Sequence, residues 1–158
     1  MKIVITGICG FEGRVLAETL LDLWPGVSIA YSGELLPVAV LLQPSQYLPQ
    51  YVPPHAVYGF GVTPLGFTAE FGRRHKLLPF LQTNAGIIVS GEPIPINVTG
   101  ATGLNFMIDI GGGVRIKTDS RLEITLGYKF LHISNGFTSA VNPGVDNNVL
   151  YTGFSLLR

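Results

Sequence analysis

The stretches LNFMIDIGGGVRIK (residues 104–117) and RLEITLGYKFLHIS (residues 121–134) decide the fold. Over residues 104–117 and 121–130, apolar side chains occupy the even positions and most polar side chains the odd ones, with Met107 as an exception. Successive side chains of a β-strand point to opposite faces, so this pattern predicts two amphipathic strands. The polar segment 118–120 between them is typical of a turn. The two stretches are therefore expected to form an antiparallel hairpin.

Strand-like alternation continues on both sides of this hairpin. Further strands are expected at about 27–42, 57–71, 77–89 and 149–157. The proline-rich stretches 43–54 and 91–102 are expected to be loops, and Pro64 to mark a bend or bulge. Several strands exceed the roughly five or six residues usual in soluble proteins and are long enough to cross a membrane at a tilt.

Composition favours a membrane protein without a spanning helix. Charged residues make up 13% of the chain and mean hydropathy is +0.41, whereas soluble domains are about 25% charged. The longest apolar run, Leu35–Leu42, is far shorter than the roughly 20 residues of a spanning helix. A barrel can be apolar without a long run, because its lipid-facing residues alternate with lumen-facing ones. A soluble sandwich shows the same alternation, but strand length and low charge favour the membrane barrel.

The net charge of zero indicates no basic face that would bind nucleic acid. Charged side chains in such a barrel are expected to pair with one another in the lumen. Three acidic residues are therefore expected to form ion pairs rather than to catalyse: Glu34, Glu70 and Asp109, with Arg73, Arg115 or Lys129 as partners.

Residues 1–26 differ from the rest of the chain. A short strand, a glycine-rich turn and a helix over 14–24 are expected there, and TGICGFEG (residues 6–13) resembles the opening of NAD-dependent epimerases and short-chain dehydrogenases. Gly7, Gly10 and Gly13 are weak candidates for cofactor contacts. No acidic second strand and no Tyr-x-x-x-Lys motif follow, so no cofactor is expected. Two units are predicted, 1–26 and 27–158, with no convincing signal peptide and no metal site.

The segment YKFLHISNG, residues 128–136, carries the chemistry. His132 and Ser134 are two residues apart on a strand, so both side chains leave its apolar face. One interpretation is that they are ordinary polar residues at a strand end near the membrane–water boundary. The other is a serine nucleophile with its imidazole base. Asp146, which follows a turn, could orient the imidazole, and Asn135 could donate to an oxyanion through its side-chain or backbone N–H.

The pattern His132-x-Ser134-Asn135, followed by NPGVD (residues 142–146), resembles the PagL-type lipid A 3-O-deacylase (acyloxyacyl hydrolase) family over about residues 27–158. The resemblance implies an eight-stranded outer-membrane barrel that removes an ester-linked acyl chain from lipid A without a metal. By position, His132 is the base, Ser134 the nucleophile and Asp146 the acid, and Asn135 lies on the oxyanion side. Asp146 replaces the family's Glu, which shortens its reach by one methylene.

The expected fold is thus all-β: an antiparallel outer-membrane-type β-barrel with about six of the eight strands, preceded by a strand-turn-helix piece. Unpaired edges in lipid cost several kcal/mol per unmet backbone group. The N-terminal piece or a second chain would have to close the barrel, or the molecule is incomplete. The expected function is a serine ester hydrolase of lipid A or a similar glycolipid in the outer membrane. The alternatives are a non-catalytic structural or lipid-binding barrel and a dinucleotide-binding oxidoreductase fragment, and the oligomeric state stays open.

Overall fold

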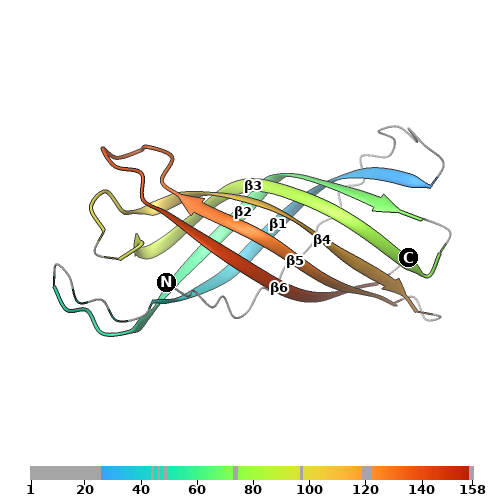
Figure 1. The fold of residues 1–158 in the computed structure, drawn as a ribbon, viewed down its shortest axis with the longest axis horizontal. Coiled ribbons are helices and arrows are strands. Elements are labelled where there is room, and N and C mark those ends of the chain that lie inside the picture. The colour runs from blue at the N-terminus through green and yellow to red at the C-terminus, as the bar shows by residue number, and fades with distance from the viewer. Residues whose placement is uncertain are drawn as a thin grey trace.

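The fold is one antiparallel sheet of six strands in chain order (Figure 1). A computed structural model describes residues 26–156 apart from positions 44, 46, 48, 49, 73, 74, 97 and 119–121. The strands are β1 (Val27–Gln43), β2 (His55–Phe71), β3 (Leu77–Ile94), β4 (Thr102–Lys117), β5 (Leu122–Ser134) and β6 (Gly144–Leu156). The described residues contain no helix that could span a membrane. The strand-turn-helix piece expected over 1–26 lies outside the described residues, except for Gly26.

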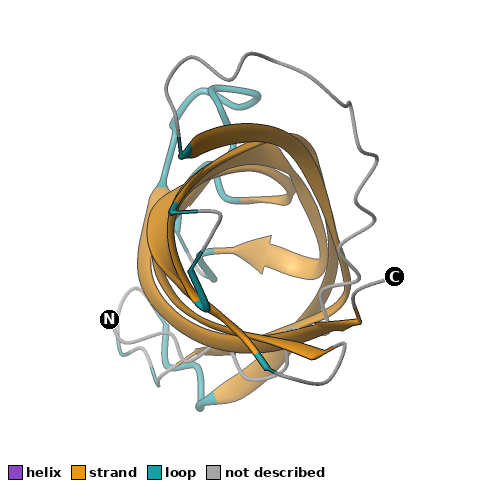
Figure 2. Ribbon diagram, turned by 90° about the vertical axis from the view of Figure 1, so that its right-hand side faces the viewer, coloured by secondary structure: helices purple, strands orange, loops and turns teal. Residues whose placement is uncertain are grey.

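The sheet curls strongly, so that its first and last strands approach each other around a common interior (Figure 2). Lys129 on β5 reaches across this interior to Glu34 on β1. Side chains of β1 and β6 also share one apolar cluster. Within the described residues, however, no backbone ladder joins β1 to β6. The sheet is therefore not closed, and its curvature is consistent with a partial β-barrel.

The strand bounds agree with the sequence in the hairpin and differ at two other places. The prediction of a loop from residue 91 is wrong at its start, because β3 continues to Ile94. Pro93 is accommodated there because it lies between Val89 and Ile94, where the ladder with β4 is interrupted. The predicted start of the last strand at 149 is also wrong, because β6 begins at Gly144 and pairs with β5 from its first residue. The bulge expected at Pro64 is confirmed by a register shift in the β2–β3 ladder.

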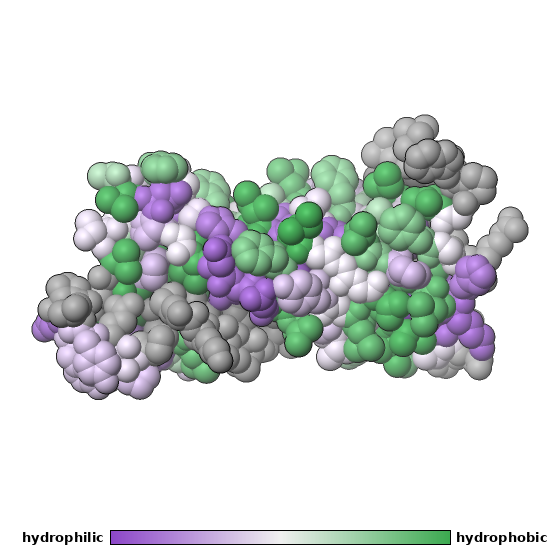
Figure 3. All heavy atoms as spheres, viewed as in Figure 1, coloured by the Kyte–Doolittle hydropathy of each residue, from purple (hydrophilic) through white to green (hydrophobic). Residues whose placement is uncertain are grey.

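Exposed apolar side chains are spread over much of the outer face seen in Figure 3, with hydrophilic side chains between them. The large hydrophobic side chains of the β4–β5 hairpin that lie on it are Leu104, Phe106, Ile108, Ile110, Leu126, Tyr128 and Phe130. Ile110, for example, is 65% exposed. A soluble sandwich would bury this face against a second sheet, whereas the described residues leave it exposed.

The interior has an apolar part and a charged part. The apolar cluster lies on the side of the longer loops and comprises Leu36, Ala39, Leu41, Val57, Ile88, Ile94, Ile96, Met107, Leu131, Ile133, Val145 and Val149. Met107, which breaks the sequence alternation, is buried in this cluster. Buried charges follow further along the same strands, with Lys129, Asp109 and Arg115 among them. The lumen behind the end of β5 is therefore largely apolar, although Asn147 is buried there opposite Leu131. The expectation of a polar lumen did not anticipate the apolar cluster.

Candidate active site

His132 and Ser134 lie at the end of β5, on the outer face. In the ladders, Ser134 is opposite Phe106 of β4 and Gly144 of β6, and His132 is opposite Ile108 and Asp146. Side chains of directly opposed residues share one face of the sheet. The end of β5 thus places a hydroxyl and an imidazole side by side, next to exposed apolar side chains of β4.

Asp146 meets His132, as the sequence predicted that it could. The two residues are register partners, and His132 Nδ1 lies 2.7 Å from Asp146 Oδ1. The side chains are 43% and 63% exposed, so this contact is at the surface. In the neutral imidazole, an Nδ1–H that donates to the carboxylate leaves Nε2 with its lone pair. Nε2 is then the ring nitrogen that can accept a proton.

Ser134 is 9% exposed. Its hydroxyl makes no hydrogen bond to another residue in the described part of the chain, so it is not held by a structural contact. Its cross-strand partner Gly144 has no side chain, and the His132 ring lies over that position. Gly144 was not predicted as a site residue; the signal available for it was the Pro143-Gly144 pair just before Asp146.

Asn135 follows Ser134 and is completely buried. Its Nδ2 donates to the carbonyl oxygens of Gly100 and Val141 at 2.7 and 2.9 Å, and its Oδ1 accepts from the backbone N–H of Phe137 at 2.9 Å. Its side chain thus joins the β3–β4 loop to the β5–β6 loop. The Ser139 hydroxyl takes part in the same network, as it donates to the Gly100 carbonyl at 2.8 Å. Sequence reasoning missed both Ser139 and Gly100, since neither has a local pattern that predicts this long-range contact.

The turn after Asn135 has a strained backbone. Gly136 and Phe137 have φ angles of 60° and 62°, in a region that bulky residues rarely adopt. The Asn135 Oδ1 contact to the Phe137 N–H holds this conformation. Strain of this kind costs about 1–3 kcal/mol and persists only where neighbouring contacts impose it. Asn135 therefore shapes the loop directly beside Ser134.

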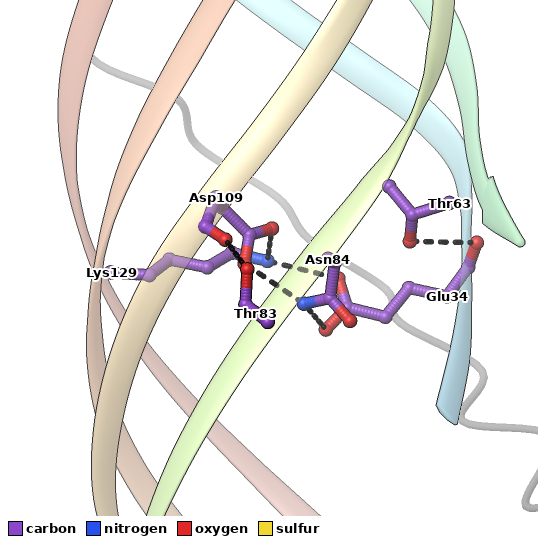
Figure 4. Close-up of polar contacts among 6 residues, drawn as sticks. All are labelled: Glu34, Thr63, Thr83, Asn84, Asp109 and Lys129. Atoms are coloured by element: carbon purple, nitrogen blue, oxygen red, sulfur yellow. Dashed lines mark hydrogen bonds and ion pairs between the residues drawn. The ribbon is translucent and has the colours of Figure 1, made fainter. Parts of the chain in front are cut away.

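The acidic residues of the interior form ion pairs, as the sequence predicted. Lys129 Nζ lies 2.9 Å from both Glu34 Oε2 and Asp109 Oδ2. Asn84 Nδ2 adds hydrogen bonds to the same two carboxylates, at 3.2 and 2.9 Å; Figure 4 shows the cluster between β1, β3, β4 and β5. Arg115 pairs with Glu70 in the same way. These contacts neutralise buried charges in the interior and do not involve His132 or Ser134 on the outer face.

Cofactor contacts and metal binding were also considered from the sequence. The candidate cofactor residues Gly7, Gly10 and Gly13 lie outside the described residues. Within the described part, no three His, Cys, Asp or Glu side chains are grouped so that they could hold a metal ion.

One comparison with known proteins identifies a family. A family model described as lipid A 3-O-deacylase (PagL) matches residues 32–155, a range that contains all four site residues of β5, β6 and their loop. Neither the comparison with curated proteins nor that with solved structures found a match. The epimerase resemblance of residues 1–26 has no support from these comparisons. The chain belongs to the lipid A 3-O-deacylase (PagL) family.

Proposed function

We propose that the chain is a serine esterase that hydrolyses an acyl ester of lipid A, or of a similar glycolipid, at the outer membrane. The observation that carries the proposal is the 2.7 Å contact between His132 Nδ1 and Asp146 Oδ1 beside Ser134, on an exposed apolar face. An imidazole oriented by a carboxylate can activate a neighbouring hydroxyl. The family match supports this reaction and this class of substrate.

In the proposed reaction, His132 Nε2 takes the proton of the Ser134 hydroxyl while Oγ attacks the ester carbonyl carbon. The tetrahedral oxyanion collapses as His132 returns the proton to the sugar oxygen, which leaves as an alcohol, and the acyl group stays on Ser134. Water then loses a proton to His132 and attacks the acyl-enzyme. This step releases the fatty acid and restores the serine hydroxyl. Asp146 stabilises the imidazolium during both steps.

The site also suggests how a lipid would bind. Phe106, Ile108 and Phe130 are exposed on the strands beside Ser134 and His132, and an acyl chain can lie against them from within a membrane. The long strands with an apolar outer face support a transmembrane barrel as the scaffold, built by residues 27–158. Within the described residues, β1 and β6 each have one unpaired edge, and further pairing would have to cover these edges in a membrane.

Asn135 is proposed to donate to the oxyanion through its backbone N–H. Its side-chain amide has acceptors in both neighbouring loops, so the backbone donor is the better candidate of the two. Asp146 in place of the family's Glu keeps the charge. Because the direct register of His132 and Asp146 brings the strands together at this level, the shorter side chain still reaches Nδ1.

The proposal is tested by incubating the detergent-refolded full chain with purified lipid A and measuring both the released fatty acid and the mass lost from the lipid. Ser134→Ala is assayed alongside, with Ser28→Ala on β1 as a serine control away from the site. Release by the wild type and Ser28→Ala, but not by Ser134→Ala, is expected. A folded wild-type protein that releases nothing would favour the non-catalytic barrel, and activity that survives Ser134→Ala would exclude Ser134 as the nucleophile.

A further inference from the structure

We propose that Gly144 is a positioning residue: its missing side chain leaves the space in which the His132 imidazole turns toward Ser134. This inference rests on the proposed function and adds a residue to its machinery. It comes from the register of β5 and β6 and from the contacts that a side chain at position 144 would make.

Four positions form a block on the outer face of these strands. Ser134 is opposite Gly144, and His132, two residues earlier, is opposite Asp146. A side chain at each of the four positions would leave the same face. Three are occupied, by a hydroxyl, an imidazole and a carboxylate, and the fourth is empty.

The imidazole ring lies across this block. Its Nδ1 is 2.7 Å from Asp146 Oδ1. At its other edge, a Cβ built on Gly144 would be 2.9 Å from Cε1 and 3.5 Å from Nε2. The ring therefore extends from Asp146 toward the row that Gly144 shares with Ser134. Any side chain at position 144 would compete with the imidazole for this space.

Glycine is needed at position 144 because of the space that the His132 ring occupies and not because of its backbone conformation. Gly144 is not among the glycines with a positive φ, so its backbone conformation is open to any residue. The nearest atom outside the His132 ring is the Ile133 carbonyl oxygen at 3.6 Å, an ordinary contact. An alanine would thus displace the His132 ring and little else. To restore an ordinary contact of 3.4 Å from one of 2.9 Å, the ring must move by about 0.5 Å or more. Because a displacement of about 1 Å in a catalytic group can lower the rate about 100-fold, a loss of at least about tenfold is expected.

The test uses Gly144→Ala in the full refolded chain, with Gly153→Ala as a matched control on the same strand, where the nearest neighbour of a Cβ is at 3.9 Å. We expect Gly144→Ala to lower kcat at least about tenfold with KM within about twofold, and to shift the nuclear magnetic resonance signal of the His132 Cε1–H. Gly153→Ala should match the wild type in both. Unchanged kcat and an unshifted signal in Gly144→Ala would overturn the inference.

A second measurement needs no variant. In the wild-type protein, a nuclear Overhauser contact between the His132 Cε1 proton and a Gly144 Cα proton is expected, and its absence would also overturn the inference. Ser134→Ala separates this result from a failure of the proposed function. If Ser134→Ala is inactive while Gly144→Ala has wild-type kcat, the esterase proposal stands and only the role of Gly144 is wrong.

Discussion

Replacing Lys129 with methionine should destabilise the protein more than any change to a surface charge. Lys129 Nζ lies 2.9 Å from Glu34 Oε2 and 2.9 Å from Asp109 Oδ2, in the interior of the curled sheet. Its side chain is 8% exposed, and that of Asp109 is 2% exposed. Methionine has a similar length and no charge, so Lys129→Met removes the cation and leaves two neighbouring buried carboxylates.

The size of the effect follows from these distances. With an effective dielectric constant of about 20, the attraction across 2.9 Å is about 6 kcal/mol for each pair. Desolvation of the three groups offsets a large part of it, and loss of one partner from a buried pair typically costs about 3–5 kcal/mol. Asn84 Nδ2 still bonds both carboxylates after the change. We therefore expect a loss of about 4 kcal/mol, a large fraction of the roughly 5–15 kcal/mol that stabilises a domain.

The measurement is the free energy of unfolding from urea titrations in detergent, followed by circular dichroism. Lys129→Met is compared in the wild-type background and in Glu34→Gln/Asp109→Asn, where no carboxylate remains to be stranded. The expected cost in the second background is below about 1 kcal/mol, because the coupling between the three groups is gone. Equal costs in both backgrounds, or a cost below 1 kcal/mol in the wild type, would refute the electrostatic explanation.

Three further predictions concern the site and the sheet. Asp146→Ala should lower kcat on lipid A about 100-fold, since the imidazole loses the partner that orients it, whereas Asp146→Glu should retain activity; equal kcat for all three proteins would contradict this role. Asn135→Ala should leave buried loop groups unsatisfied at a cost of about 1–3 kcal/mol and speed hydrogen exchange over residues 136–143, and unchanged exchange would argue against it. Gly86→Ala should cost about 1–3 kcal/mol in urea titrations, because its Cβ would clash with the Val62 carbonyl oxygen of β2. Gly91→Ala, whose nearest atom is at 3.8 Å, should be nearly neutral, and equal costs would count against this packing.

Alternation predicted the β4–β5 hairpin nearly to the residue. Residues 104–117 and 121–134 were expected, and the structure has Thr102–Lys117 and Leu122–Ser134. The prediction is accurate in this hairpin because one face is exposed and apolar along most of its length. The polarity of each residue therefore indicates which face of the sheet its side chain occupies. The ion pairs of Lys129 followed from the same reasoning, since polar residues on the opposite face share a common interior.

The errors arise where local propensity and cross-strand pairing disagree. Asn147 and Asn148 favour turns, yet both lie in β6 because pairing with β5 begins at Gly144. The contact of Asp146 with His132 was anticipated from the turn before Asp146. The loop contacts of Asn135 and the space over Gly144 depend on register, which a single sequence leaves undefined.

The proposal that His132 activates Ser134 as a nucleophile is tested most directly by identifying the residue that reacts with a fluorophosphonate ester probe. The refolded full chain is labelled, digested and mapped by mass spectrometry, with His132→Ala alongside. We expect one adduct, on Ser134, formed by the wild type and at least about 100-fold more slowly by His132→Ala, which lacks the imidazole base. An adduct on another serine, or labelling of Ser134 that does not depend on His132, would contradict it.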